Sequence, residues 1–184
     1  SLEADPGMAK KDISGATITL GERLTYNGEE QTQTVATVKI DGLTVTYTVS
    51  GNTGTNVGDY TLTVTGTGNF TGSVTKQWSV KEAAAVVTKA PAAKSLTYTG
   101  EAQALVNAGA TADGKLVYSL TVNGEFTETI PAGTNAGEYM VWYYAVGDDN
   151  HSDSAKASVK VTIAKAKATI TVDTTAINVT YGEG

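Results

Sequence analysis

The chain has 184 residues, a formal net charge of −6 and no cysteine. The negative charge argues against binding to nucleic acids and to anionic membrane surfaces. Without cysteine there is no disulfide and no thiolate that could act as a nucleophile or a zinc ligand. No stretch is apolar over the ~18 residues of a membrane-spanning helix, so we expect no membrane insertion in this segment. We also expect no cofactor.

Two sequence motifs occur twice, which predicts a tandem repeat. The motif at residues 24–31 (LTYNGEEQ) returns at 96–103 (LTYTGEAQ). The motif at 55–60 (TNVGDY) returns at 134–139 (TNAGEY), and residues 179–184 begin the first motif again. Repeats of this length indicate separate small domains rather than a solenoid, whose repeats span about 20–50 residues. We expect a segment of a longer array with a polar lead-in at 1–11, a first repeat at 12–83, a second at 84–166 and the start of a third at 167–184.

The first repeat reads as a series of short strands. Residues 43–49 (LTVTYTV) alternate between apolar residues and threonine, so Leu43 and Val45 are expected to face inward with the other apolar residues. They follow Asp41-Gly42, a hairpin signal, which makes residues 34–40 the expected antiparallel partner. Residues 60–65 alternate in the same way, and a turn at 66–69 leads into a last strand.

In the second repeat the corresponding strands are expected at residues 116–122, 139–146 and 158–163. Short strands separated by Gly- and Asn-containing turns predict an all-β fold, an antiparallel β-sandwich in each repeat. The alternative is a β-grasp-like module whose single helix would lie within residues 101–112. The joint after each repeat is rich in Ala and Lys and has no glycine, which indicates a stiff, end-to-end connection.

The motifs resemble the bacterial Ig-like family of MBG domains. The resemblance rests on the "TYxG" opening, the "NxGxY" strand start, the turn at 66–70 (GTGNF), and the strand ends at Val80 and Ile163. It covers about residues 14–166, and it departs at residues 148–153 (DDNHSD), where His151 replaces the aromatic residue of the turn. It implies two tandem Ig-like β-sandwich domains and the opening strand of a third.

Members of this family are found in tandem in large secreted and cell-surface proteins. The resemblance therefore implies a non-catalytic stalk or spacer outside a bacterial cell, with adhesion as a further role. The expected partners are adjacent repeats of the same chain, with a host glycan or protein as an alternative, and we expect a monomer. Accessory domains of a secreted carbohydrate-active enzyme would look the same in this sequence.

The sequence offers little material for catalysis or metal binding. His151 is the single histidine, and it lies in an expected turn, where no Ser/Asp arrangement accompanies it. We expect no enzyme activity. Clustered oxygen ligands in a loop can bind Ca²⁺, which makes Asp148, Asp149 and Asp153 a weak calcium candidate. The alternative is a hairpin tip exposed to solvent.

A second candidate site is an aromatic stripe in the second repeat. Alignment of residues 139–144 (YMVWYY) with residues 60–65 places Met140, Trp142 and Tyr144 on the outer face, where the first repeat has threonines. Large apolar side chains on one exposed face often mark a contact surface, here for a glycan or a protein. The alternative is that a loop covers this face, and Phe126 is the residue that could do so.

Overall fold

The computed structural model describes residues 7–172 and residue 182. Within this part of the chain every regular element is a β-strand, which confirms the all-β prediction. The segment at 101–112, where the β-grasp alternative needs a helix, instead contains β16 (Gln103–Ala104), β17 (Val106–Asn107) and β18 (Ala110–Thr111). The described residues include no helix long and apolar enough to cross a membrane.

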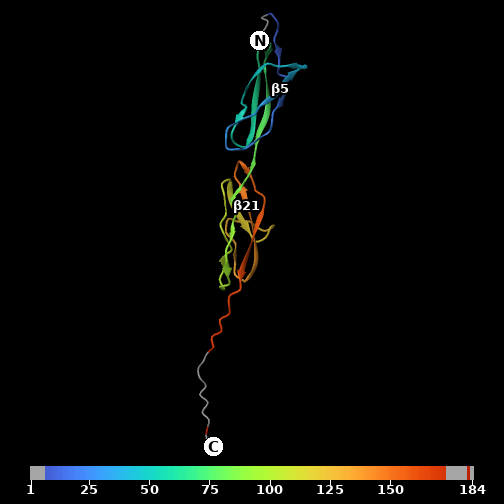
Figure 1. The fold of residues 1–184 in the computed structure, drawn as a ribbon. Helices are drawn as coiled ribbons and strands as arrows, with labels where there is room; N and C mark the ends of the chain where they lie inside the picture. The colour runs from blue at the N-terminus through green and yellow to red at the C-terminus, as the bar shows by residue number, and fades with distance from the viewer. Residues whose placement is uncertain (1–6, 173–181, 183–184) are drawn as a thin grey trace.

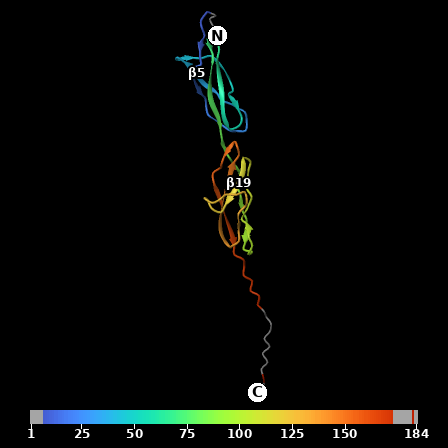
Figure 2. The same ribbon diagram turned by 180° about the vertical axis from the view of Figure 1, so that it is seen from behind.

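The strands form two groups that lie end to end and are joined by one extended stretch of chain, green in Figures 1 and 2. The first unit contains β1 (Lys11–Asp12), β2 (Thr17–Leu20), β3 (Leu24–Thr25), β4 (Gln31–Thr32), β5 (Val35–Ile40), β6 (Leu43–Thr44), β7 (Tyr47–Ser50), β8 (Thr53–Gly54), β9 (Gly58–Gly66), β10 (Phe70–Thr71) and β11 (Ser73–Lys81). Besides β16–β18, the second unit contains β12 (Ala83–Ala84), β13 (Val87–Lys89), β14 (Ala92–Ala93), β15 (Leu96–Thr97), β19 (Gly114–Ser119), β20 (Ala132–Gly133), β21 (Gly137–Gly147), β22 (His151–Ser152) and β23 (Ala157–Ala164).

The main sheet has the same strand order in both units. In the first unit the order is β3-β11-β9-β7, and in the second it is β15-β23-β21-β19. In each sheet the long strands pair antiparallel, and the short first strand pairs in parallel with the last one. The repeated sequence motifs therefore correspond to a repeated sheet topology.

Each unit has a hydrophobic core of its own. In the first unit Leu62, Val64 and Trp78 of the main sheet meet Ile18 and Val38 of the smaller sheet β2-β5-β6. In the second unit a separate cluster combines buried residues of the main sheet with two residues from the segment between β15 and β19. Its members are Leu105, Val106, Tyr118, Val141, Tyr143, Val161 and Ile163. Alternation along β9 and β21 directs every second side chain into these cores, as the sequence pattern predicts.

The hairpin predicted at Asp41-Gly42 is present, but the strand that follows it is shorter than expected. Both turn residues have positive φ (48° and 77°), the backbone that a two-residue hairpin favours. Residues 43–49 are not one strand: β6 pairs with β5, and β7 pairs with β9 in the main sheet. The chain changes sheets at Val45, which is buried, whereas Leu43 at the hairpin tip is 52% exposed. The inward prediction for Leu43 is therefore wrong.

The prediction of a strand at 116–122 is also wrong about where the strand ends. β19 stops at Ser119, and Leu120 and Val122 are exposed in the loop that follows. This loop spans residues 120–131, whereas in the first unit only residues 51–52 separate β7 from β8. The apolar alternation of the sequence continues past Ser119, but the strand does not, because the loop folds back and Thr127 forms a bridge with Tyr118.

At the two outer boundaries of the expected domains, the described residues form a short strand at the first and none at the second. Lys11, assigned to the lead-in, already belongs to β1, which pairs in parallel with β10. The third repeat is expected at 167–184, and Thr180 and Tyr181 of its "TYG" echo lie outside the described residues. Within the described part, residues 165–172 form no strand.

The repeated tyrosines Tyr60 and Tyr139 secure the start of the long strands. Tyr60 donates its hydroxyl hydrogen bond to the carbonyl of Asn56 (2.7 Å), and Tyr139 does the same to Asn135 (2.8 Å). This fixes the loop before β9 and before β21 in the same shape. It is the structural role that we expect for a tyrosine beside a turn.

Candidate functional site

The joint between the units is an almost unbroken strand. β11 ends at Lys81 and β12 begins at Ala83, so only Glu82 separates them. β11 pairs with β9 and β3 in the first unit, and β12 pairs in parallel with β22 in the second. Because the backbone is held on both sides of a single residue, the joint has few bonds about which it can bend.

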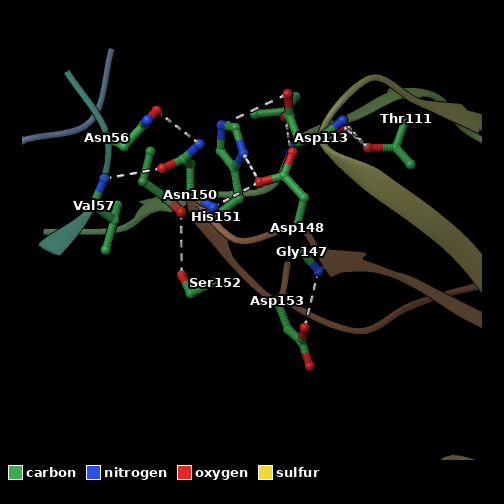
Figure 3. Close-up of polar contacts among 12 residues, drawn as sticks. Asn56, Val57, Thr111, Asp113, Gly147, Asp148, Asn150, His151, Ser152 and Asp153 are labelled. Carbon is green, nitrogen blue, oxygen red and sulfur yellow. Dashed lines mark hydrogen bonds and ion pairs between the residues drawn. The ribbon is translucent and has the colours of Figure 1, made fainter. Parts of the chain in front are cut away.

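Asn150 connects the turn before β22 to the end of the first unit (Figure 3). Its side-chain oxygen accepts a hydrogen bond from the backbone N–H of Val57 (2.9 Å), and its Nδ2 donates to Oδ1 of Asn56 (3.5 Å). Its backbone carbonyl accepts from the N–H of Ala83 (3.2 Å). One residue therefore contacts both the strand that joins the units and the loop before β9.

His151 adds a ring contact across the same joint. Its ring meets the Tyr26 ring edge-on, with centroids 5.2 Å apart and an interplanar angle of 89°. The His151 side chain is only 15% exposed, and its Nδ1 lies 2.7 Å from Oδ1 of Asp148. Because an ionised carboxylate can only accept a hydrogen bond, Nδ1 is the ring nitrogen that carries the hydrogen and donates the hydrogen bond to Asp148. The opposite nitrogen, Nε2, lies 3.7 Å from Asp113.

The carboxylates of this turn bind backbone and imidazole donors. Asp148 accepts from the N–H of Asn150 (2.9 Å), and Asp153 accepts from the N–H of Gly147 (3.0 Å). Asp113 accepts from the N–H of Val86 (2.8 Å) and so fixes the chain just after the joint. The hydrogen bond from the His151 side chain is the main cause that holds the pKa of Asp148 below its ordinary value, and the hydrogen bond from the backbone of Asn150 is the next largest. The carboxylates thereby shape the turn that carries Asn150 and His151.

The calcium candidate gains no support from this geometry. Asp148 and Asp153 are engaged as described, and Asp149 is exposed. In the part of the chain that the structure describes, no group of three or more His, Asp or Glu side chains is arranged to hold a metal ion. The turn is not the solvated tip of the alternative interpretation either, because its Asn150 and His151 contact the first unit.

The aromatic stripe lies on the outer face of β21, as the alignment predicts. Met140 is 41% exposed, whereas Trp142 and Tyr144 are half-buried. The ring of Phe126 packs edge-on against Tyr144 (5.0 Å between centroids), and the Lys156 ammonium lies 4.7 Å from the Phe126 centroid. Lys156 also donates to the carbonyl of Val122 (2.9 Å), which ties the loop at 120–131 to this face. The loop thus covers part of the stripe.

Comparison with known protein families matches residues 16–84 to the model of the MBG domain. Residues 16–84 form an MBG domain. MBG domains are repeat domains of surface proteins, typical of extracellular bacterial proteins, and the family is non-catalytic. No curated protein matches the chain.

The MBG domain match covers the first unit's side of the joint and also β12, the first strand of the second unit. Tyr26, Asn56 and Val57 lie inside it, and its last residues are β12. The sequence analysis placed Tyr26 in the repeated "TYxG" opening without a contact role, and it missed Asn150 as a contact residue. The available signal was positional: the opening motif, the "NxGxY" loop and the end of the last strand all meet at one end of a unit.

Proposed function

We propose that residues 12–166 are two tandem Ig-like β-sandwich modules that serve as a rigid, non-catalytic spacer in a bacterial cell-surface protein. The observation that carries this proposal is the joint, where the turn with Asn150 and His151 docks on Tyr26, Asn56 and Val57 beside a nearly continuous strand. A spacer must resist bending between its modules. The joint resists it with one covalent connection and several separate contacts.

The second module is proposed as a further repeat of the same kind. Its support is the shared strand order of the main sheet and the shared parallel pairing of the first strand with the last. In both units a short preceding strand also pairs in parallel with the strand after the turn, β1 with β10 and β12 with β22. Each unit has its own core, as a module in an array requires.

Adhesion through the aromatic stripe has weaker support. Phe126 and Lys156 already occupy the neighbourhood of Tyr144, and Ser119 beside Trp142 is buried. A loop that packs on an apolar face removes that face from contact with a partner. We therefore interpret the stripe mainly as a small outer core under the loop at 120–131.

Small-angle X-ray scattering of the chain tests the spacer. A compact globule of this length has a radius of gyration of about 16 Å, and a rigid pair of modules gives a value well above it. The double variant Tyr26→Ala/Asn150→Ala should bend more freely and lose the long-distance end of the pair-distance distribution. Its matched control, Tyr98→Ala/Asn69→Ala, changes the equivalent residues away from the joint and should keep the wild-type profile. A compact wild-type profile, or equal changes in both double variants, contradicts the proposal.

A further inference from the structure

The far end of the second unit repeats the docking end of the first. Tyr98 follows β15 as Tyr26 follows β3, and each donates its N–H to the end of the last strand of its own unit: Tyr98 to Ala164 and Tyr26 to Lys81, both at 2.8 Å. Gln103 donates to Thr97 (3.0 Å) as Gln31 donates to Thr25 (2.9 Å). The backbone that holds the tyrosine at the joint is therefore built again at the far end.

The loop that receives Asn150 is also repeated. The bond from Tyr139 to Asn135 has the geometry of the bond from Tyr60 to Asn56. Asn135 and Ala136 therefore hold the positions that Asn56 and Val57 hold at the joint. Among the described residues, no partner accepts a hydrogen bond from the N–H of Ala136, whereas the N–H of Val57 donates to Asn150. Tyr98 is 42% exposed, and Tyr26, which contacts His151, is half-buried.

A surface cavity lies over these repeated residues. Tyr98, Asn135 and Ala136 line a cavity of about 450 Å³ together with residues 165–168. A cavity of about 470 Å³ lies at the equivalent end of the first unit, where Val57, Lys81 and Glu82 line it and Ser152 of the second unit forms part of its wall. The chain leaves both ends along the last strand, at Ala164 and at Lys81.

We propose that this distal face, defined by Tyr98, Asn135 and Ala136, is a docking site for a third unit of the same kind. The third unit would present an Asn side chain to the N–H of Ala136 and the next residue's ring to Tyr98. Both known units offer this pair in the corresponding turn, Asn69-Phe70 and Asn150-His151. The argument is continuity with the joint already described, and it rests on the proposed spacer function.

Hydrogen exchange of two backbone amides tests the proposal in an extended chain. In this extended chain, residues 1–166 are followed directly by a second copy of residues 84–166. The strand β23 then continues into the added unit in the same way as β11 continues into β12. In the present chain the Val57 amide should exchange slowly and the Ala136 amide rapidly. In the extended chain the Ala136 amide should slow by about tenfold, the effect of one hydrogen bond. Replacing the Asn of the added turn, the copy of Asn150, by Ala should restore rapid exchange.

A second extension protects the test against poor folding of the added copy. Residues 1–165 followed by residues 11–82 add a copy of the first unit, which offers Asn69 and Phe70 instead. Core amides of the added unit report whether it has folded. If the third unit folds but the Ala136 amide still exchanges rapidly while the Val57 amide exchanges slowly, the docking site is refuted and the spacer proposal stands. If Val57 is also rapid, the spacer proposal and the docking site both fail.

Discussion

Replacing Asn150 by Ala should loosen the joint without disturbing the fold of either unit. Among the described residues, the Asn150 side chain forms hydrogen bonds only with Val57 and Asn56, and its backbone N–H is held independently by Asp148. The substitution therefore removes contacts across the joint and leaves the turn in place. This makes Asn150 a sharper probe than the residues that shape the turn.

The expected magnitude follows from the two bonds. The bond from Val57 (2.9 Å) has good geometry and lies in a partly buried position, so its loss costs about 1 kcal/mol. The hydrogen bond to Asn56 (3.5 Å) is as long as a hydrogen bond can be, so it stabilises the closed joint by a few tenths of a kcal/mol at most. Together they favour the closed joint by about 1–1.5 kcal/mol, so the open population should rise by about five- to twelvefold.

Distance measurement between spin labels detects this change. The chain has no cysteine, so Thr61→Cys and Thr162→Cys place one label on each unit at exposed strand positions. Asn150→Ala should broaden the distance distribution relative to the parent. Asn69→Ala is the matched control, because Asn69 takes the same place in the turn of the first unit, away from the joint. An unchanged width in Asn150→Ala, or equal broadening in the control, would refute the reasoning.

Three further substitutions test other parts of the account. Tyr26→Ala removes the ring contact with His151 and should lower the unfolding free energy by about 0.5–1.5 kcal/mol beyond the loss of burial; Tyr98→Ala, with no ring contact in the described part of the chain, should cost less in the same urea titration. Gly54→Ala places a Cβ 2.7 Å from the Tyr60 ring and should destabilise by about 1–3 kcal/mol, whereas Gly15→Ala, which has nothing within 4 Å, should leave the melting temperature near the parent's. The pKa of Asp148 lies below its ordinary value of 3.8, so its ionised form stabilises the turn at higher pH, and that contribution is lost as the pH falls through the folded pKa. In Asp148→Asn, stability should therefore fall less between neutral pH and pH values below 3.8; an identical pH profile would contradict the assignment.

The elements that could be predicted from the sequence are those in which a local pattern determines the outcome. Leu62 and Val64 are buried because alternation with threonine fixes their face, and Asp41-Gly42 forms a hairpin because its backbone suits that turn. Leu43 was mispredicted because alternation sets which face a residue occupies, not where a strand changes sheets. The end of β19 was mispredicted because the loop after it continues the apolar pattern while folding onto the strand.

The joint could not be predicted because its residues are far apart in the sequence. Asn150 meets Val57 across 93 positions, and neither residue has an unusual local pattern. The acidic turn suggested calcium because three aspartates lie within six residues, yet two of them accept hydrogen bonds within the turn. For the stripe, parity correctly placed Met140, Trp142 and Tyr144 on one face, but the cover by Phe126 depends on a tertiary contact.

Residual dipolar couplings measured on the chain in a weakly aligning medium test the central claim most directly. Backbone amides of β9 and β11 report the orientation of the first unit, and those of β21 and β23 report that of the second. If the joint holds the units as one rigid spacer, a single alignment tensor will fit both sets of couplings. Two tensors of clearly different magnitude would show that the units reorient independently and would contradict the account.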